Sequence, residues 1–216
     1  MKVSDINYYN NDFLKSSVIA SLCRDSLKML QAVFRIKQED LIRAHHKKMH
    51  QDPSDFNEDL FHLSQKIYEE LLIDDIKIIS AFENFFKALL LESGFIFHET
   101  KKNKSPVQIL PYPKNTAEIK KTTYGISTLL NNAFWKIFSL SNSDKTYISG
   151  IRDRRNTIHL LTSKPSYSPF TVLDEIEILA PIIKDRISIK YKEYCKKINV
   201  DHRPELIDFS YLNNKT

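Results

Sequence analysis

The sequence predicts an all-α protein, an up-and-down bundle of four to five long helices joined by short loops. Glycine is scarce, with three residues in 216 against eight prolines, which is typical of long helices and not of a turn-rich all-β chain. Apolar residues recur at three- and four-residue spacings along most of the chain, as amphipathic helices require. With 42% apolar residues the chain can bury a core, so we expect one helical domain over residues 1–198 and a polar tail over 199–216.

Two long helical segments are expected in the first half of the chain. The first covers residues 12–50 and stops at the Gln-Asp-Pro sequence of residues 51–53. A capping box of Asp55 and Glu58 begins the second, a long helix or a helix pair that reaches Gly94, where glycine suits a helix C-terminus. A stripe of large apolar residues in the second segment is expected in the core: Phe82, Phe85, Phe86, Leu89 and Leu90.

The helical pattern is interrupted in the middle of the chain. Residues 99–115, ETKKNKSPVQILPYPKN, hold three prolines and four lysines and are interpreted as a basic surface loop, either a solvated connector or a contact with nucleic acid. Asn115 and Glu118 offer another capping box, for a helix that continues through Phe138.

The last third of the chain returns to helices. The polar break at residues 141–144, SNSD, is expected to cap the next helix. That helix is expected to end at the turn of residues 162–170, TSKPSYSPF. Helical patterning resumes over residues 172–198, where Pro181 should kink or divide the segment. The tail that follows either frays or docks.

The composition excludes several classes of protein. The three glycines stand too far apart for a glycine-rich phosphate loop, and Cys23 and Cys195 are expected to be reduced and structural, without a disulfide framework or a zinc site. The N-terminal residues lack a signal-peptide pattern, and no apolar run approaches the roughly 18 residues of a membrane span. We therefore expect a cytoplasmic protein with no membrane association and no cofactor.

Charge is distributed unevenly along the chain. Residues 1–100 carry 12 Lys and Arg against 16 Asp and Glu, whereas residues 101–216 carry 20 against 11. This asymmetry fits a polyanionic partner as well as it fits a solvated basic surface.

The decapeptide IRDRRNTIHL, residues 151–160, gathers cations around one histidine. At about 100° per residue in a helix, Ile148 and Ile151 fall on a core face, and Arg154 points away from the histidine. Gly150, without a side chain, would let another backbone approach. The polar face consists of four residues within about 100°: Arg152, Arg155, Asn156 and His159.

Such a face suits cleavage of a phosphodiester. Arginine provides permanently charged donors for phosphate oxygens, and histidine can accept or donate a proton near neutral pH. In RNA the 2′-hydroxyl is an internal nucleophile, so a base and a cation suffice and no metal is needed. The alternative is a surface cluster paired with acidic neighbours.

The spacing resembles the signature of the HEPN superfamily, an arginine, a polar residue and a histidine near the end of a helix. Arg152, with six residues before His159, fits the longer form of this signature, and Arg154, with four, fits the shorter form. The Arg155-Asn156 pair is similar to the frequent Arg-Asn dyad of the family but stands one residue too close to the histidine. Which arginine takes the family's role stays open, and helix geometry favours Arg152 with Arg155.

This resemblance implies a helical bundle that acts as a metal-independent endoribonuclease and leaves 2′,3′-cyclic phosphate ends. It implies a homodimer whose two motif helices form a composite site, in a toxin with an antitoxin partner or in an anti-phage effector. His159 would act on the 2′-hydroxyl or the leaving oxygen, Arg152 or Arg155 would hold the phosphate, and Asn156 would orient the histidine. Glu83, in AFENFFKALL, resembles the acidic residue that some members place opposite the motif. Other members have lost catalysis and bind RNA or nucleotides.

One further cluster, RAHHKKMH at residues 43–50, places His46 and His50 four residues apart, a spacing that can bind a divalent metal. The lysines between them oppose cation binding and suit a solvated helix C-terminus, so we expect no metal site. Two further interpretations of the whole protein stay open beside the nuclease. It could be a noncatalytic helical module that binds RNA, nucleotide or a protein partner, or a structural bundle whose arginines pair with acidic residues of neighbouring helices.

Overall fold

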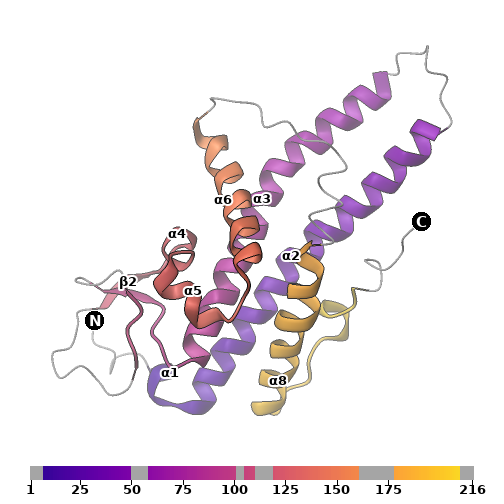
Figure 1. Cartoon of the computed structure of the whole chain (residues 1–216). Helices are drawn as coiled ribbons and strands as arrows, with labels where there is room; N and C mark the ends of the chain where they lie inside the picture. Colours follow the sequence, from indigo (N-terminus) through magenta and orange to yellow (C-terminus); the bar gives the residue numbers. More distant parts are fainter. Residues whose placement is uncertain (1–6, 50–57, 101–104, 110–118, 161–177, 210–216) are drawn as a thin grey trace.

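A pair of long antiparallel helices forms the centre of the computed structural model (Figure 1). They are α2 (Asp12–Met49) and α3 (Glu58–Glu92), which pack along their length. The structure describes residues 7–49, 58–100, 105–109, 119–160 and 178–209, and within these the side chains outside 35–49, 58–72 and 157–160. The predicted stop after the first segment and its capping residue Asp55 lie outside the described residues. The described chain is mostly helical, as the composition predicts.

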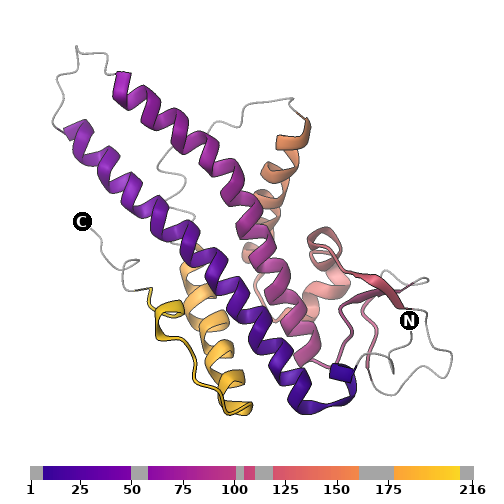
Figure 2. The same ribbon diagram turned by 180° about the vertical axis from the view of Figure 1, so that it is seen from behind.

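Two further helices flank this pair on opposite sides (Figures 1 and 2). The motif helix α6 (Asn142–Leu160) packs on α3, and α8 (Ile189–Lys197) packs on α2. Short elements complete the fold: α1 (Asn7–Asn10), α4 (Ile126–Leu129), α5 (Asn132–Phe138), the π-helix η2 (Ile182–Ser188) and the 3-10 helix η3 (Pro204–Leu206). None of the helices in the described part of the chain has the length and hydropathy of a membrane span.

A β-hairpin replaces the first part of the helix predicted over residues 115–138. Strand β1 (His98–Thr100) pairs antiparallel with β2 (Ile119–Thr123), so the predicted surface loop begins with a strand, and Asn115 and Glu118 themselves lie outside the described residues. Exposed side chains of β2 bond across the hairpin, since Glu99 accepts from Lys120 at 3.2 Å and from the hydroxyl of Thr122 at 3.1 Å. The helical prediction was wrong here because this pairing outweighs a weak local preference.

The apolar core lies where the helices meet. The predicted stripe on α3 is buried, and the ring of Phe86 stacks on Phe138 with centroids 4.7 Å apart. Ile148 and Ile151 bring α6 into the same core, as the helical geometry predicts. Both cysteines are free and buried, and burial raises the pKa of the Cys23 thiol to about 12.

Helix ends follow the sequence signals. Gly94 has φ +80° just after α3, the left-handed conformation expected of a residue that ends a helix. Ser141 and Asp144 form the capping box of α6, because the Asp144 amide donates to the Ser141 hydroxyl and the Ser141 amide donates to the Asp144 carboxylate. Regular α-helical bonding stops at Pro181, where η2 begins.

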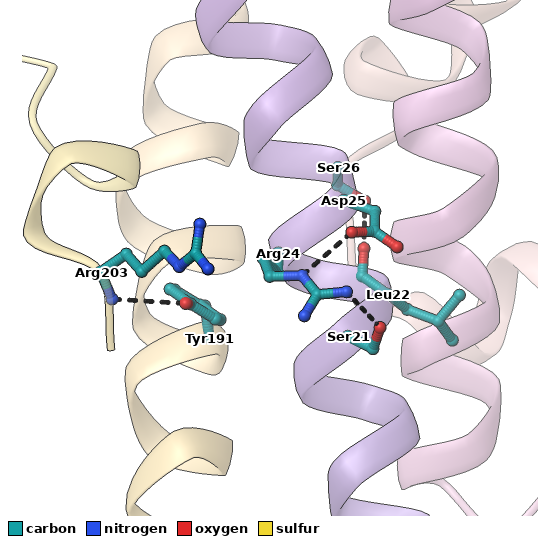
Figure 3. A network of polar contacts seen from close by, with 7 residues as sticks. All are labelled: Ser21, Leu22, Arg24, Asp25, Ser26, Tyr191 and Arg203. Carbon is teal, nitrogen blue, oxygen red and sulfur yellow. Dashed lines mark hydrogen bonds and ion pairs between the residues drawn. The ribbon is translucent and has the colours of Figure 1, made fainter. Parts of the chain in front are cut away.

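The described part of the tail docks instead of fraying. The backbone amide of Arg203 donates to the hydroxyl of Tyr191 on α8 at 3.3 Å (Figure 3). Gln31 on α2 donates to the backbone carbonyls of Glu205 and Asp208. Leu206 and Phe209 are buried beneath this segment.

Candidate functional site

Arg154 is held by a buried carboxylate of the neighbouring helix. Its Nε and Nη2 donate to the two oxygens of Asp75 on α3, at 3.1 and 3.2 Å. The Asp75 side chain is 2% exposed and that of Arg154 24% exposed. A forked guanidinium–carboxylate pair of this kind fixes both side chains, so Arg154 anchors α6 to α3.

Arg152 has a local partner. Its Nε and Nη2 donate to one oxygen of Asp153, at 2.9 and 2.7 Å, and the Asp153 side chain is 63% exposed. The Arg152 side chain is 23% exposed and water reaches the exposed Asp153 carboxylate, so this pair is weak. The guanidinium of Arg152 is therefore available to a stronger anion.

Arg155 has a donor without an acceptor. Its Nη2 donates to the side-chain oxygen of the exposed Asn156 at 3.1 Å. Its Nε is buried, and no described residue accepts a hydrogen bond from it. A buried N–H of a cation that lacks a partner is costly, and an anion would satisfy it.

His159 lies in the last turn of α6, and its side chain is outside the described residues. The structure therefore gives only the backbone position of His159, which lies one helical turn after Arg155 and Asn156. The side chain of His46 in α2 and the whole of His50 are likewise outside the described residues.

Glu83 lies away from the arginines of α6. One oxygen accepts from Lys87 at 2.6 Å, and the other accepts from the backbone amide of Ile126 at 3.0 Å. The carboxylate thus satisfies the first amide of α4 and neutralises a buried lysine. Among the described side chains, the acidic residue that contacts the motif is Asp75 instead.

Two exposed isoleucines lie near the arginine face. Asp75 and Arg154 mark one edge of the contact between α3 and α6, which run antiparallel (Figure 1). At about 100° per residue, Ile76 on α3 and Arg152 on α6 point to the opposite edge. Ile76 is 41% and Ile73 56% exposed. This edge therefore combines the guanidinium group of Arg152 with apolar surface.

Sequence reasoning missed the acidic pair at residues 74–75. Asp74 and Asp75 are both buried, and Asp74 also pairs with Lys77 at 3.5 Å. The signal was present, because two adjacent aspartates interrupt the apolar stretch LLIDDIKII. Buried carboxylates of this kind require partners on neighbouring helices.

The described residues offer no metal centre, since no three His, Cys, Asp or Glu side chains among them gather closely enough to bind an ion. Gly150 is exposed, and a Cβ built there would meet no atom within 4 Å, so the close backbone approach predicted at this glycine is not seen among the described residues. The chain matches no protein-family model, no curated protein and no solved structure.

Proposed function

We propose that the protein is a HEPN-type, metal-independent endoribonuclease that leaves 2′,3′-cyclic phosphate ends. We further propose that it acts in the cytoplasm as a toxin or an anti-phage effector, and that α2, α3, α6 and α8 form an up-and-down bundle that carries the site. The observation that carries the proposal is the buried Nε of Arg155, which has no acceptor among the described residues. A phosphate oxygen would supply that acceptor.

The three arginines of the motif would have different roles. Arg154 is engaged by Asp75, so it would support the helix and not bind substrate. Arg155 would donate its Nε to a phosphate oxygen, and Arg152 would exchange the exposed Asp153 for a second oxygen of the same group. Two charge-assisted contacts of this kind would hold one phosphate against α6.

The cleavage step follows from the chemistry of RNA. His159 would take the proton of the 2′-hydroxyl, and the 2′-oxygen would attack phosphorus while the bond to the 5′-oxygen breaks. The leaving 5′-oxygen would take a proton from water, which gives a 5′-hydroxyl and a 2′,3′-cyclic phosphate. Arg152 and Arg155 would stabilise the charge that builds on the phosphorane. Asn156, three residues before His159, lies on the same helix face and would orient the imidazole.

A homodimer forms part of the proposal. One copy of the motif supplies one histidine, and a composite site needs a second copy across a two-fold axis. The exposed Ile73 and Ile76 lie at the edge toward which Arg152 points, and they supply apolar surface for such an interface. An antitoxin-like partner would cover the same edge.

A noncatalytic RNA-binding module is the second candidate. The unpaired donor of Arg155 requires an acceptor, and an RNA phosphate would supply one without a histidine that moves protons. This candidate and the nuclease share Arg152 and Arg155 and differ only in the role of His159.

The test is RNA cleavage in EDTA by the wild type and by His159→Ala, with total cellular RNA and a tRNA pool as substrates. We expect cyclic phosphate ends from the wild type and a loss of about 10² to 10⁴ in rate for the variant, the range of a lost general base. His202→Ala removes an exposed histidine of the tail and should cleave normally. RNA binding without cleavage by the folded wild type would favour the noncatalytic module, and neither binding nor cleavage would reject both.

A further inference from the structure

The short helix α1 is attached to the hairpin by aromatic rings. The ring of Tyr8 stacks on Phe97 with centroids 5.8 Å apart and planes within 5°. Tyr9 meets the rings of Phe97 and His98 edge-on, each at 6.0 Å, and its side chain is buried. The helix has only four residues, so these contacts and not its own backbone hold it in place.

The hydroxyl of Tyr9 is hydrogen-bonded both to the backbone of Phe97 and to the imidazole of His98. The backbone amide of Phe97 donates to the hydroxyl oxygen at 3.2 Å. The hydroxyl and Nδ1 of His98 are 2.8 Å apart. In the neutral tautomer that carries its proton on Nε2, Nδ1 of His98 accepts the phenol proton of Tyr9. The anchor of α1 therefore depends on an uncharged imidazole.

The surroundings favour the same neutral form. Burial and the charge of Lys87 on α3 lower the pKa of His98 below its usual value. Lys87 is itself buried and is neutralised in part by Glu83, at 2.6 Å. Glu99, the neighbour of His98 on β1, pairs with Lys120 of β2. The other described titratable groups nearby are the phenols of Tyr8, Tyr9 and Tyr124, whose pKa values burial raises, so they stay neutral in acid.

We propose that protonation of His98 releases α1 from the hairpin, so that this contact is an acid-sensitive anchor. A proton on Nδ1 would face the Tyr9 hydroxyl, whose own proton would then have to turn away from the imidazole in a buried position. The imidazolium would also lie close to Lys87, a second buried cation. This anchor is independent of the ribonuclease proposal.

The direction of the pH effect follows from linkage. The pKa of His98 is lower in the closed form than in the released form, where it returns toward about 6.5. The released form therefore binds more protons as the pH falls through about 6.5. Closure is complete above that pH and weakens below it.

Amide hydrogen exchange of the full chain tests the anchor, at pH 7.5 and pH 5.5 with correction for intrinsic exchange rates. We expect protection of residues 7–10 and of the amide of Phe97 to fall several-fold at the lower pH, while α3 from residue 78 to 91 stays protected. His98→Asn keeps an acceptor near the position of Nδ1 and cannot titrate, so its protection should not respond to pH. His202→Gln, a change at an exposed histidine, should respond as the wild type does.

A second measurement needs no variant at position 98. The imidazole signals of His98 in the wild type, followed by NMR, should titrate with the same midpoint as the loss of protection at Phe97. Tyr9→Phe removes the hydroxyl and should lower protection of α1 at both pH values. The proposal is overturned if wild-type protection is constant between the two pH values, if His98→Asn keeps the pH response, or if the two midpoints differ.

Discussion

Two arginines, one on α2 and one on α6, differ in how many of their hydrogen-bond donors have acceptors. On α2, Arg24 donates through Nε to Asp25 at 3.1 Å and through Nη2 to the hydroxyl of Ser21 at 2.9 Å (Figure 3). On α6, Arg155 has one bond to an exposed amide, and its Nε is buried without an acceptor among the described residues. Both are arginines near a contact between helices. A guanidinium donor that lacks an acceptor therefore indicates where an anion would bind, more than the number of cations does.

The largest expected effect comes from the buried partner of Arg154. Asp75→Ala removes a carboxylate that is 2% exposed and leaves the guanidinium without its fork. We expect the free energy of unfolding in urea to fall by about 3 kcal/mol, at the low end for a broken buried pair, because a quarter of the Arg154 side chain reaches water.

The matched control is Asp25→Ala, which breaks the more exposed pair with Arg24 and should cost at most about 1 kcal/mol. The double change Asp75→Ala with Arg154→Ala should cost less than the sum of the two single changes. Equal costs at Asp75 and Asp25 would contradict the anchoring role of Arg154.

The sequence predicts the elements whose signals are local. The apolar stripe at Phe82 and Phe86, the glycine that ends α3 and the capping box of Ser141 and Asp144 all occur as expected. Each depends on residues within one or two turns of one another, and helical periodicity captures that range. The angle of about 100° per residue also predicts that Ile151 lies in the core and that Arg154 lies on another side of the helix from Arg152, as the structure has them.

Long-range partners could not be predicted in the same way. The hairpin depends on the pairing of His98 with Thr123, 25 residues later, which no periodicity within either strand reveals. The pairing of Arg154 with Asp75 joins residues 79 positions apart. The resemblance places Glu83 opposite the motif, and in the structure Glu83 lies about two turns beyond Asp75 and contacts α4. A charged residue in an apolar stretch indicates a buried charge. The residue that pairs with it can be identified only from the fold.

A smaller effect is expected on RNA affinity, which we compare between a variant at Arg155 and a variant at Arg24. Arg155→Ala removes a donor that an RNA phosphate would satisfy, so affinity should fall roughly tenfold or more, as for one charge-assisted hydrogen bond. The slope of log K against log salt should also become shallower by about 0.7 to 0.9.

Arg24→Ala should leave both quantities unchanged, because Arg24 lies on α2 and outside the motif of α6. Filter binding or fluorescence anisotropy with a labelled tRNA pool at several salt concentrations measures both quantities. Similar losses for the two variants would mean that binding depends on overall charge and not on the site.

The smallest effect separates two glycines, Gly150 inside α6 and Gly94 just after α3. Gly150 is exposed inside α6 with open space at the Cβ position, so Gly150→Ala should raise the free energy of unfolding by about 0.5 to 1 kcal/mol through helix propensity. Gly94 has φ +80°, where a Cβ is strained, so Gly94→Ala should lower it by about 1 kcal/mol. Thermal unfolding at several protein concentrations measures both. The stabilisation at Gly150 is expected only if that surface of α6 faces water. A loss of stability there that grows with protein concentration would mean that a second copy of the chain approaches α6 at this glycine, which would place Gly150 in the dimer interface.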